Sequence, residues 1–207
     1  MDILVTGFLP FPGVHVNPTT ALARAVATRL RRAGLDARAL VLETSYSGGL
    51  PTLRRHLAGE RPKAVLMLGL AARARNVRVE RFARGRASLL HPDSTGGTPG
   101  AKPAASSRSL PMRASGDVDT ALAALRRAGI RCRLSPSAGR YLCDASYAET
   151  LAWSAKTGAP AIFIHVPWLR PAPGSRPAHR VAGFRPGIAA LSAALAAVGR
   201  DLARRSR

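Results

Sequence analysis

The sequence contains few cysteines. Only Cys132 and Cys143 occur among its 207 residues, which is too few for a framework of disulfide bonds. Free thiols suit a reducing compartment, and Asp2 stands where a secretory signal would be basic, so we expect a cytoplasmic protein. A bond between the two cysteines is the alternative, and it would block Cys143 as a nucleophile.

Long apolar runs and metal-binding motifs are also missing. No hydrophobic stretch reaches the about 20 residues that a membrane-spanning helix needs, so we expect no membrane association. There is no Cys-x-x-Cys, no His-x-x-x-His and no carboxylate cluster. The glycine-rich segment 96–100 lacks the lysine of a phosphate-binding loop. We therefore expect neither a metal ion nor another cofactor.

Acidic residues and lysine are scarce, whereas arginine is abundant. The chain has 32 basic and 11 acidic residues, and nearly all of the basic ones are arginine. The net charge of +21 would suit a nucleic-acid or polyanion binder. The densest cluster comprises Arg73, Arg75, Arg78, Arg81, Arg84 and Arg86. Arginine in place of lysine, together with abundant alanine, is typical of a GC-rich genome. We therefore favour a solvated surface and keep polyanion binding as a third hypothesis.

Strand-like segments alternate with helix-like ones along the chain, and hydrophobic residues make up 46% of it, which indicates a globular α/β protein. The expected strands are 2–6, 37–42, 64–68, 76–83, 131–135 and 161–166, and the expected helices are 17–34, 50–59, 117–128, 145–156 and 186–204. A Pro/Gly/Ser-rich loop is expected at about 91–116. With no internal repeat, residues 1–207 are predicted to form a single-domain three-layer α/β/α sandwich with a mostly parallel, mixed central sheet.

Cys143 is the strongest candidate for a reactive residue. It lies where a strand turns into a helix, and the positive end of the helix dipole favours a thiolate there. Such a cysteine is a nucleophile if a base and an orienting acid lie nearby. His165 is the candidate base because it ends an apolar strand, where sites form in parallel sheets. The alternative for His165 is a core histidine that bonds a backbone carbonyl.

Glu80 is the candidate acid. It lies on a strand-like segment, and its carboxylate would accept a hydrogen bond from the histidine ring and fix the tautomer. The alternative is a surface charge paired with Arg78 or Arg81. Many proteins contain a glutamate, a cysteine and a histidine, so spacing alone does not choose between the two.

Several short motifs, taken in chain order, resemble those of one enzyme family. They are Gly7-Phe8-Leu9-Pro10-Phe11 with Asn17-Pro18-Thr19, Glu80-Arg81-Phe82-Ala83, Pro92-Asp93, Ser137-Ala138-Gly139-Arg140-Tyr141-Leu142-Cys143 and Phe163-Ile164-His165-Val166-Pro167. Each motif alone is modest, but the set resembles the pyroglutamyl-peptidase I (pyrrolidone-carboxylate peptidase) family over residues 2–167. The matching regions span most of the chain.

The resemblance implies a cysteine exopeptidase that removes an N-terminal pyroglutamyl (5-oxoproline) residue from small peptides with a blocked N-terminus. By the same resemblance, Cys143 is the nucleophile, His165 the general base and acid, and Glu80 the residue that orients His165. No cofactor is implied. Family members often associate, so the resemblance leaves open a homo-oligomer formed through the apolar C-terminal helix, although a core role for that helix is favoured.

The family's specificity rests on a small apolar pocket for the lactam ring. Phe8 and Phe11 match its aromatic positions, and core packing is their alternative role. Weaker pocket candidates are Thr44, Tyr141 and Leu142. A neutral lactam is selected by shape and a few hydrogen bonds, so small changes in the pocket matter.

The chain departs from the family at several polar positions. Leu70 stands where many members have glutamine, and Ala72-Arg73-Ala74 stands where a glycine-rich element with arginine is usual. Asp144 replaces an asparagine after the nucleophile. These departures indicate a divergent member. They motivate a second hypothesis, in which the same fold and triad act on a different N-blocked or lactam amide, or act weakly.

Overall fold

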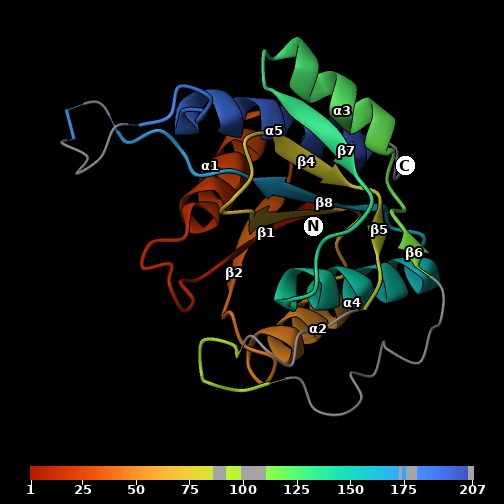
Figure 1. The fold of residues 1–207 in the computed structure, drawn as a ribbon. Coiled ribbons are helices and arrows are strands. Elements are labelled where there is room, and N and C mark those ends of the chain that lie inside the picture. Colours follow the sequence, from red (N-terminus) through yellow and green to blue (C-terminus); the bar gives the residue numbers. More distant parts are fainter. Residues whose placement is uncertain (86–91, 99–110, 173, 176–180, 205–207) are drawn as a thin grey trace.

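A six-stranded sheet forms the centre of the protein in the computed structural model, which describes residues 1–85, 92–98, 111–172, 174–175 and 181–204 (Figure 1). Its strands are β1 (Ile3–Phe8), β2 (Ala37–Leu42), β3 (Val65–Leu70), β4 (Val77–Glu80), β7 (Cys132–Ser135) and β8 (Ala161–Val166). The order across the sheet is β2-β1-β3-β8-β4-β7. β4 pairs antiparallel with β8 and parallel with β7, while the other four strands are parallel. The predicted mostly parallel, mixed sheet is confirmed.

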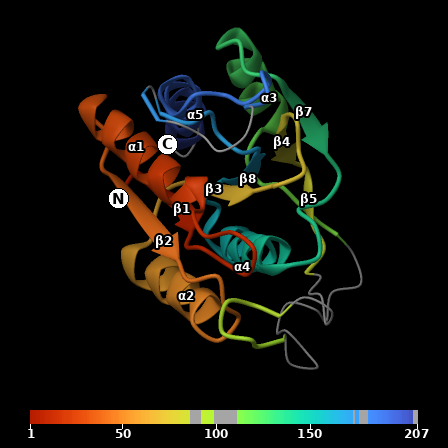
Figure 2. The same ribbon diagram turned by 60° about the vertical axis from the view of Figure 1, so that its left-hand side comes forward.

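Helices cover both faces of the sheet (Figures 1 and 2). One face carries α1 (Pro18–Arg32), α3 (Val118–Arg127) and α5 (Ile188–Arg204), and the other carries α2 (Gly49–Glu60) and α4 (Leu142–Thr157). Each face has its own cluster of buried apolar side chains. The three-layer prediction is therefore confirmed. In the described part of the chain, no helix has the length and apolar character needed to span a bilayer.

Strand alternation decides which face each side chain reaches. On β8, Ile162 and Ile164 pack toward α1, α3 and α5, whereas Phe163 packs toward α2 and α4. Because the side-chain period of a strand is two, His165 points to the same face as Phe163. On β4, Val79 belongs to the first core, so Glu80 also faces α4. This arrangement brings Glu80 and His165 to the layer that holds Cys143.

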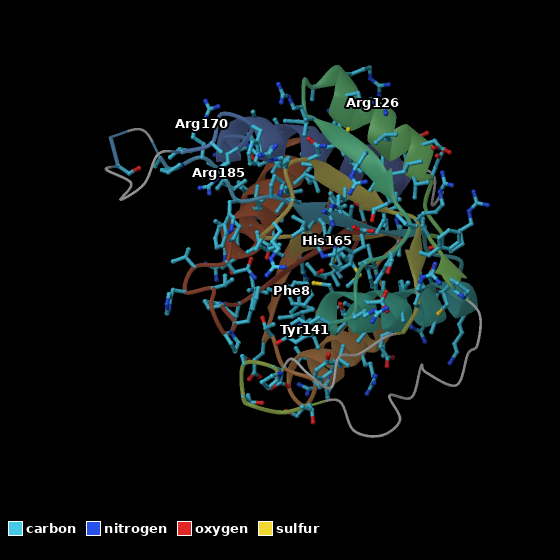
Figure 3. The ribbon with its side chains drawn as sticks, viewed as in Figure 1. Phe8, Arg126, Tyr141, His165, Arg170 and Arg185 are labelled. Carbon is cyan, nitrogen blue, oxygen red and sulfur yellow. The ribbon has the colours of Figure 1, made fainter. Side chains whose placement is uncertain are left out.

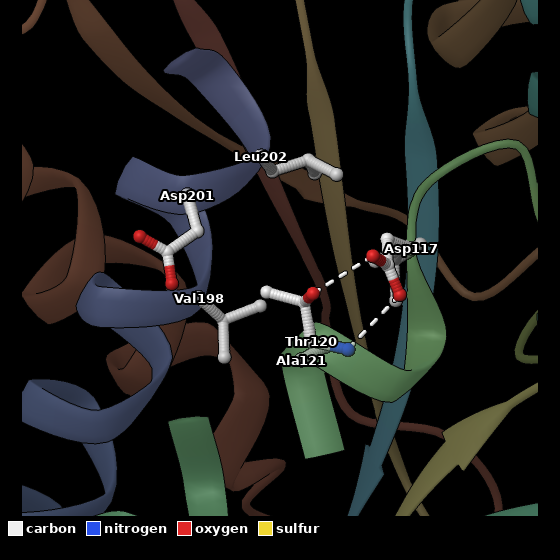
Figure 4. Close-up of a pocket in the computed structure, with 7 residues that line it drawn as sticks. Asp117, Thr120, Ala121, Val198, Asp201 and Leu202 are labelled. Atoms are coloured by element: carbon white, nitrogen blue, oxygen red, sulfur yellow. Dashed lines mark hydrogen bonds between the residues drawn. The ribbon is translucent and has the colours of Figure 1, made fainter. Parts of the chain in front are cut away.

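Helix starts follow the local sequence. Asn17 caps α1, and its side chain accepts a hydrogen bond from the Thr19 N–H at 3.1 Å. Asp117 caps α3, and its side chain accepts hydrogen bonds from the Asp119 and Thr120 N–H groups. Figure 4 shows Asp117 bonded to Thr120 at a small crevice between α3 and α5.

The segment 76–83 differs from the single strand that its alternation predicts. The strand is interrupted at Arg81. The N–H of Arg81 donates a hydrogen bond to Ser135 O, and its carbonyl accepts one from the Ala114 N–H. The next residues form β5 (Phe82–Ala83), which pairs antiparallel with β6 (Met112–Arg113) in a separate ribbon. β6 lies inside the segment that was expected to be a loop. Residues 91 and 99–110 of that segment lie outside the described residues.

The C-terminal helix contributes to the core. Leu191, Leu195 and Val198 of α5 are buried against the sheet, while Ile188 at its start is exposed. The core interpretation therefore holds for these three side chains.

Candidate active site

Glu80 and His165 meet on the α4 side of the sheet. His165 Nδ1 lies 2.9 Å from Glu80 Oε1. Glu80 is fully buried and His165 is 7% exposed, so water does not screen the contact. Glu80 Oε2 has no hydrogen-bond partner among the described residues, which leaves His165 as the group that compensates the carboxylate charge. This contact excludes the surface-charge interpretation of Glu80.

Gly69 provides the space for the imidazole. It is the residue of β3 that pairs with His165 across the β3–β8 ladder. A Cβ at this position would lie 2.9 Å from His165 Cδ2 and 2.7 Å from the Phe163 ring, closer than side chains approach. Only a glycine fits here without displacing the histidine.

Cys143 lies in the first turn of α4, which begins at Leu142, three residues before the predicted start. The turn before the helix contains Gly139 at φ 101°, a left-handed conformation that favours glycine. The Cys143 thiol lies beside the His165 ring, whose protonated form it favours. Because Glu80 occupies Nδ1, Nε2 is the ring nitrogen that is left for the thiol. Both cysteines are free, so the alternative of a bond between Cys132 and Cys143 is wrong for this structure.

The surroundings of His165 favour its charged form. Burial alone would lower the pKa of the imidazole, but hydrogen bonds and charge from Cys143 and Glu80 outweigh burial and raise it to about 9. A protonated His165 therefore lies between two groups that carry or can carry negative charge. The imidazole is therefore held in its protonated form at neutral pH, ready to act as a proton donor.

A cavity of about 270 Å³ opens beside the thiol. All five predicted substrate-binding residues line it together with two of the predicted catalytic residues: Phe8, Phe11, Thr44, Tyr141, Leu142, Cys143 and His165. Figure 3 shows Phe8, Tyr141 and His165 close together in the middle of the molecule, whereas Arg126, Arg170 and Arg185 lie at its edges. Phe8 belongs to the α2/α4 core as well, so its packing and cavity roles coincide.

Tyr141 connects the cavity to the segment 92–97. Its hydroxyl donates to Pro92 O at 3.0 Å, and its ring lies 6.2 Å from that of Phe11. Burial, with the charges of Asp93 and Cys143, raises the pKa of the phenol to about 12, so Tyr141 stays a donor. Asp93 is buried, and hydrogen bonds from Tyr46 N, Thr95 and Gly97 N lower its pKa despite that burial. The Pro-Asp motif thus holds Tyr141, which lines the cavity, in place.

Sequence reasoning missed six residues that line the cavity. They are Asn17, Leu70, Ala72, Ala138, Gly139 and Arg140. Asn17 was recognised only as part of a family motif, and Leu70 and Ala72 only as departures from the family pattern. Gly139 and Gly69 carried a usable signal, because glycine in a strand or turn marks a close approach. Arg140 carried none.

The comparisons with known proteins agree with this geometry. The sequence profile of the family described as pyroglutamyl peptidase matches residues 1–197. The chain belongs to the pyroglutamyl peptidase family. A pyrrolidone-carboxylate peptidase of Streptomyces coelicolor is 34% identical over 205 residues, covering 94% of this chain and 91% of that protein. One of Thermococcus kodakarensis is 33% identical over 170 residues, covering 81% of this chain and 82% of that protein.

Solved structures of the family share the fold. The pyrrolidone carboxyl peptidase of Thermococcus litoralis matches with a TM-score of 0.81 at 29% identity, covering 99% of this chain and 96% of that one. That of Thermus thermophilus gives 0.79 at 30% identity, covering 99% and 100%. Family membership confirms the expected cysteine peptidase.

Gly69→Ala is expected to displace His165. The added methyl group collides with the imidazole and the Phe163 ring, so kcat/KM should fall by about 10- to 100-fold, because small misplacements of a catalytic group are costly. Steady-state kinetics and thermal melting check this. Gly59→Ala on α2 is the matched control, since nothing lies within 4 Å of its added Cβ. Unchanged kinetics in Gly69→Ala would contradict the close packing of His165.

Proposed function

We propose that this protein removes N-terminal pyroglutamyl residues from peptides, with Cys143 as nucleophile, His165 as general acid and base, and Glu80 as the residue that orients His165. The observation that carries the proposal is the 2.9 Å hydrogen bond between His165 and Glu80, with Cys143 and His165 lining the same mostly apolar cavity. The family supports the same activity.

Each step of the reaction has a group available for it. The Cys143 thiolate attacks the carbonyl carbon of the pyroglutamyl residue and forms a carbon–sulfur bond. The carbon–nitrogen bond then breaks, and His165 Nε2 gives its proton to the leaving amine. Water, deprotonated by the same nitrogen, hydrolyses the thioester and releases pyroglutamate. Glu80 keeps the imidazole in one tautomer and stabilises its charged form.

The start of α4 supplies donors for the oxyanion. The first turn of a helix leaves main-chain N–H groups without partners within the helix, and Leu142 and Cys143 open α4. Donors of this kind stabilise the negative oxygen that forms when the thiolate attacks. The helix dipole adds to the effect.

The cavity suits a small neutral ring. Phe8, Phe11 and Leu142 provide apolar surface beside the thiol. Thr44 Oγ1 donates to Leu9 O at 2.8 Å, and Asn17 Nδ2 donates to the same carbonyl at 3.1 Å, so both polar side chains are held in fixed positions. A rigid, mostly apolar cavity selects a neutral lactam by its shape.

A second candidate function is hydrolysis of a different N-blocked or lactam amide. Leu70 and Ala72, two departures from the family pattern, both line the cavity and favour a less polar ring. A panel of pyroglutamyl, prolyl and N-acetyl amides separates the two candidates. The first predicts the highest kcat/KM for pyroglutamyl amides, and the second predicts that another blocked amide is cleaved better.

The proposed function is tested with a fluorogenic pyroglutamyl amide. Purified protein in a reducing buffer should hydrolyse it, and an alkylating reagent should stop the reaction. Hydrolysis that survives complete alkylation of Cys143 would exclude the thiol mechanism, and absence of hydrolysis in the reduced protein would exclude the activity.

The pH dependence follows from the His165 pKa. That pKa is raised from 6.5 to about 9, so the imidazolium is present at neutral pH and is lost as the pH rises through about 9. Activity should therefore fall along a basic limb near that pH, which a kcat/KM profile measures. The same contact stabilises the fold fully below pH 6.5 and ceases to do so as the pH rises through about 9. If kcat/KM already declines as the pH rises through 6.5, the raised pKa of His165 is contradicted.

Three broader expectations stay predictions. A cytoplasmic location is supported by the two free thiols. We further expect that residues 1–207 form one domain and that the protein forms a homo-oligomer. Polyanion binding has weaker support: within the arginine cluster, Arg75 stacks on Phe184 at 5.5 Å, and Arg86 lies outside the described residues.

A further inference from the structure

A second cavity adjoins the one beside the thiol. It has a volume of about 450 Å³ and is lined by Phe11, Pro12, Arg73, Pro92 and Tyr141. Phe11 and Tyr141 line both cavities, so their two rings form the boundary between them. A pyroglutamyl ring in the inner cavity, with its carbonyl at Cys143, directs the rest of the peptide outward. The outer cavity, which shares Phe11 and Tyr141 with the inner one, offers space for the residue that follows the scissile bond.

The charges around these two cavities have one sign. Arg73 is the charged residue that lines the outer cavity, and Arg140 lines the inner one at its exposed rim. No carboxylate lines either cavity among the described residues, and neither arginine forms an ion pair with a described acidic residue. Their guanidinium groups are therefore available to a ligand.

The nearest acidic residue on this wall is already engaged. Asp93 follows Pro92, but its carboxylate is buried and accepts hydrogen bonds from Tyr46 N, Thr95 and Gly97 N. Those bonds hold the carboxylate within its own turn. Asp93 therefore fixes the turn that follows Pro92, and the charge presented to a ligand in the outer cavity is the positive charge of Arg73.

We propose that Arg73 makes this enzyme prefer substrates with a carboxylate just after the scissile bond. That carboxylate is either an acidic side chain on the following residue or the free C-terminus of a pyroglutamyl dipeptide. A guanidinium presents a planar fork of donors that matches a carboxylate. The proposal rests on the proposed function, since it assumes that a pyroglutamyl residue fills the inner cavity. The proposal adds to that function the chemical class of the peptide that is released.

General attraction by a chain of net charge +21 is the competing explanation. Such attraction acts at long range and is screened by salt in every arginine variant alike. A subsite at Arg73 instead depends on one residue. Arg127, exposed at the end of α3, provides the matched control because it lines neither cavity.

The test compares kcat/KM for four substrates: pyroglutamyl-glutamate amide, pyroglutamyl-glutamine amide, pyroglutamyl-glutamine with a free C-terminus, and pyroglutamyl-lysine amide. If Arg73 binds an acidic side chain, wild type should prefer pyroglutamyl-glutamate amide over pyroglutamyl-glutamine amide by roughly three- to tenfold. If Arg73 binds the C-terminus, wild type should instead prefer pyroglutamyl-glutamine with a free C-terminus over its amide. Arg73→Ala should abolish the preference, Arg73→Glu should invert it toward lysine, and Arg127→Ala should keep it. Equal preferences in wild type and Arg73→Ala would overturn the proposal.

Two further readouts separate this inference from the proposed function. The fluorogenic pyroglutamyl amide has no carboxylate, so its hydrolysis by wild type reports on the proposed function, whereas the ratio of kcat/KM between acidic and neutral peptides in each variant reports on the subsite. Calorimetric binding of the same four peptides to Cys143→Ala, with and without Arg73→Ala, measures the subsite without catalysis. If the peptides that carry a carboxylate bind more tightly and this preference depends on Arg73, the subsite is supported even when hydrolysis is absent. Binding without that preference refutes the subsite.

Discussion

Cys143→Ala is expected to lower kcat/KM for a pyroglutamyl amide by at least about four orders of magnitude, because the covalent route disappears with the thiol. His165 and the oxyanion donors remain, but they have no nucleophile to activate. The loss should appear in kcat, whereas binding of pyroglutamate or an uncleaved peptide should persist, since the cavity walls are unchanged. Steady-state kinetics and calorimetry with the same ligand check both parts.

The control for this variant is Cys132→Ala. Burial raises the pKa of the Cys132 thiol, and its Sγ donates to Leu122 O at 3.6 Å, so it lacks the features of a nucleophile. Cys132→Ala should keep activity within about twofold, and thermal melting should show that both variants fold. Activity retained in Cys143→Ala, or lost in a folded Cys132→Ala, would contradict the assignment.

Glu80→Gln is expected to lower kcat/KM by about 10²- to 10⁴-fold and to move the basic limb of the pH profile downward. Glutamine can still accept the hydrogen bond from Nδ1, but it removes the buried negative charge 2.9 Å away. Burial then opposes protonation of His165 with less compensation, so its pKa falls from about 9. The imidazolium is depleted at neutral pH, and the leaving amine loses its proton donor.

Glu149→Gln separates this effect from a general change of charge. Glu149 pairs with Arg54 on the surface of α4, and exposed pairs contribute little. That variant should keep both the rate and the pH profile. A Glu80→Gln protein that loses stability but keeps its basic limb near pH 9 would reduce Glu80 to a packing role.

Much of the fold could be predicted because each element carried its own local signal. The continuous apolar run of β3 predicts a strand buried on both faces, and Asn17-Pro18 predicts the start of α1. The break at Arg81 could not be predicted, because it depends on hydrogen bonds to Ser135 and Ala114, which are distant in the sequence. The orientation of β4 against β8 is also a property of the topology, which alternation does not encode.

The site divides in the same way. Cys143 and His165 could be predicted from local position, at a helix start and a strand end. For Glu80 the local sequence left two interpretations open, and only the family resemblance favoured the orienting role, because the contact depends on β4 running opposite to β8, which brings Glu80 next to Phe163 and within reach of the imidazole. Gly69 and Arg73 escaped prediction because their roles depend on a neighbouring strand and on a second cavity.

Reaction with a pyroglutamyl chloromethyl ketone, followed by peptide mass mapping, tests most directly whether Cys143 is a nucleophile at a pyroglutamyl-binding cavity. One adduct is expected, on Cys143 and not on Cys132, forming in step with the loss of hydrolysis and slowed by a pyroglutamyl peptide. Full hydrolytic activity in protein whose Cys143 is completely alkylated would contradict the mechanism, and so would labelling that a pyroglutamyl peptide does not slow.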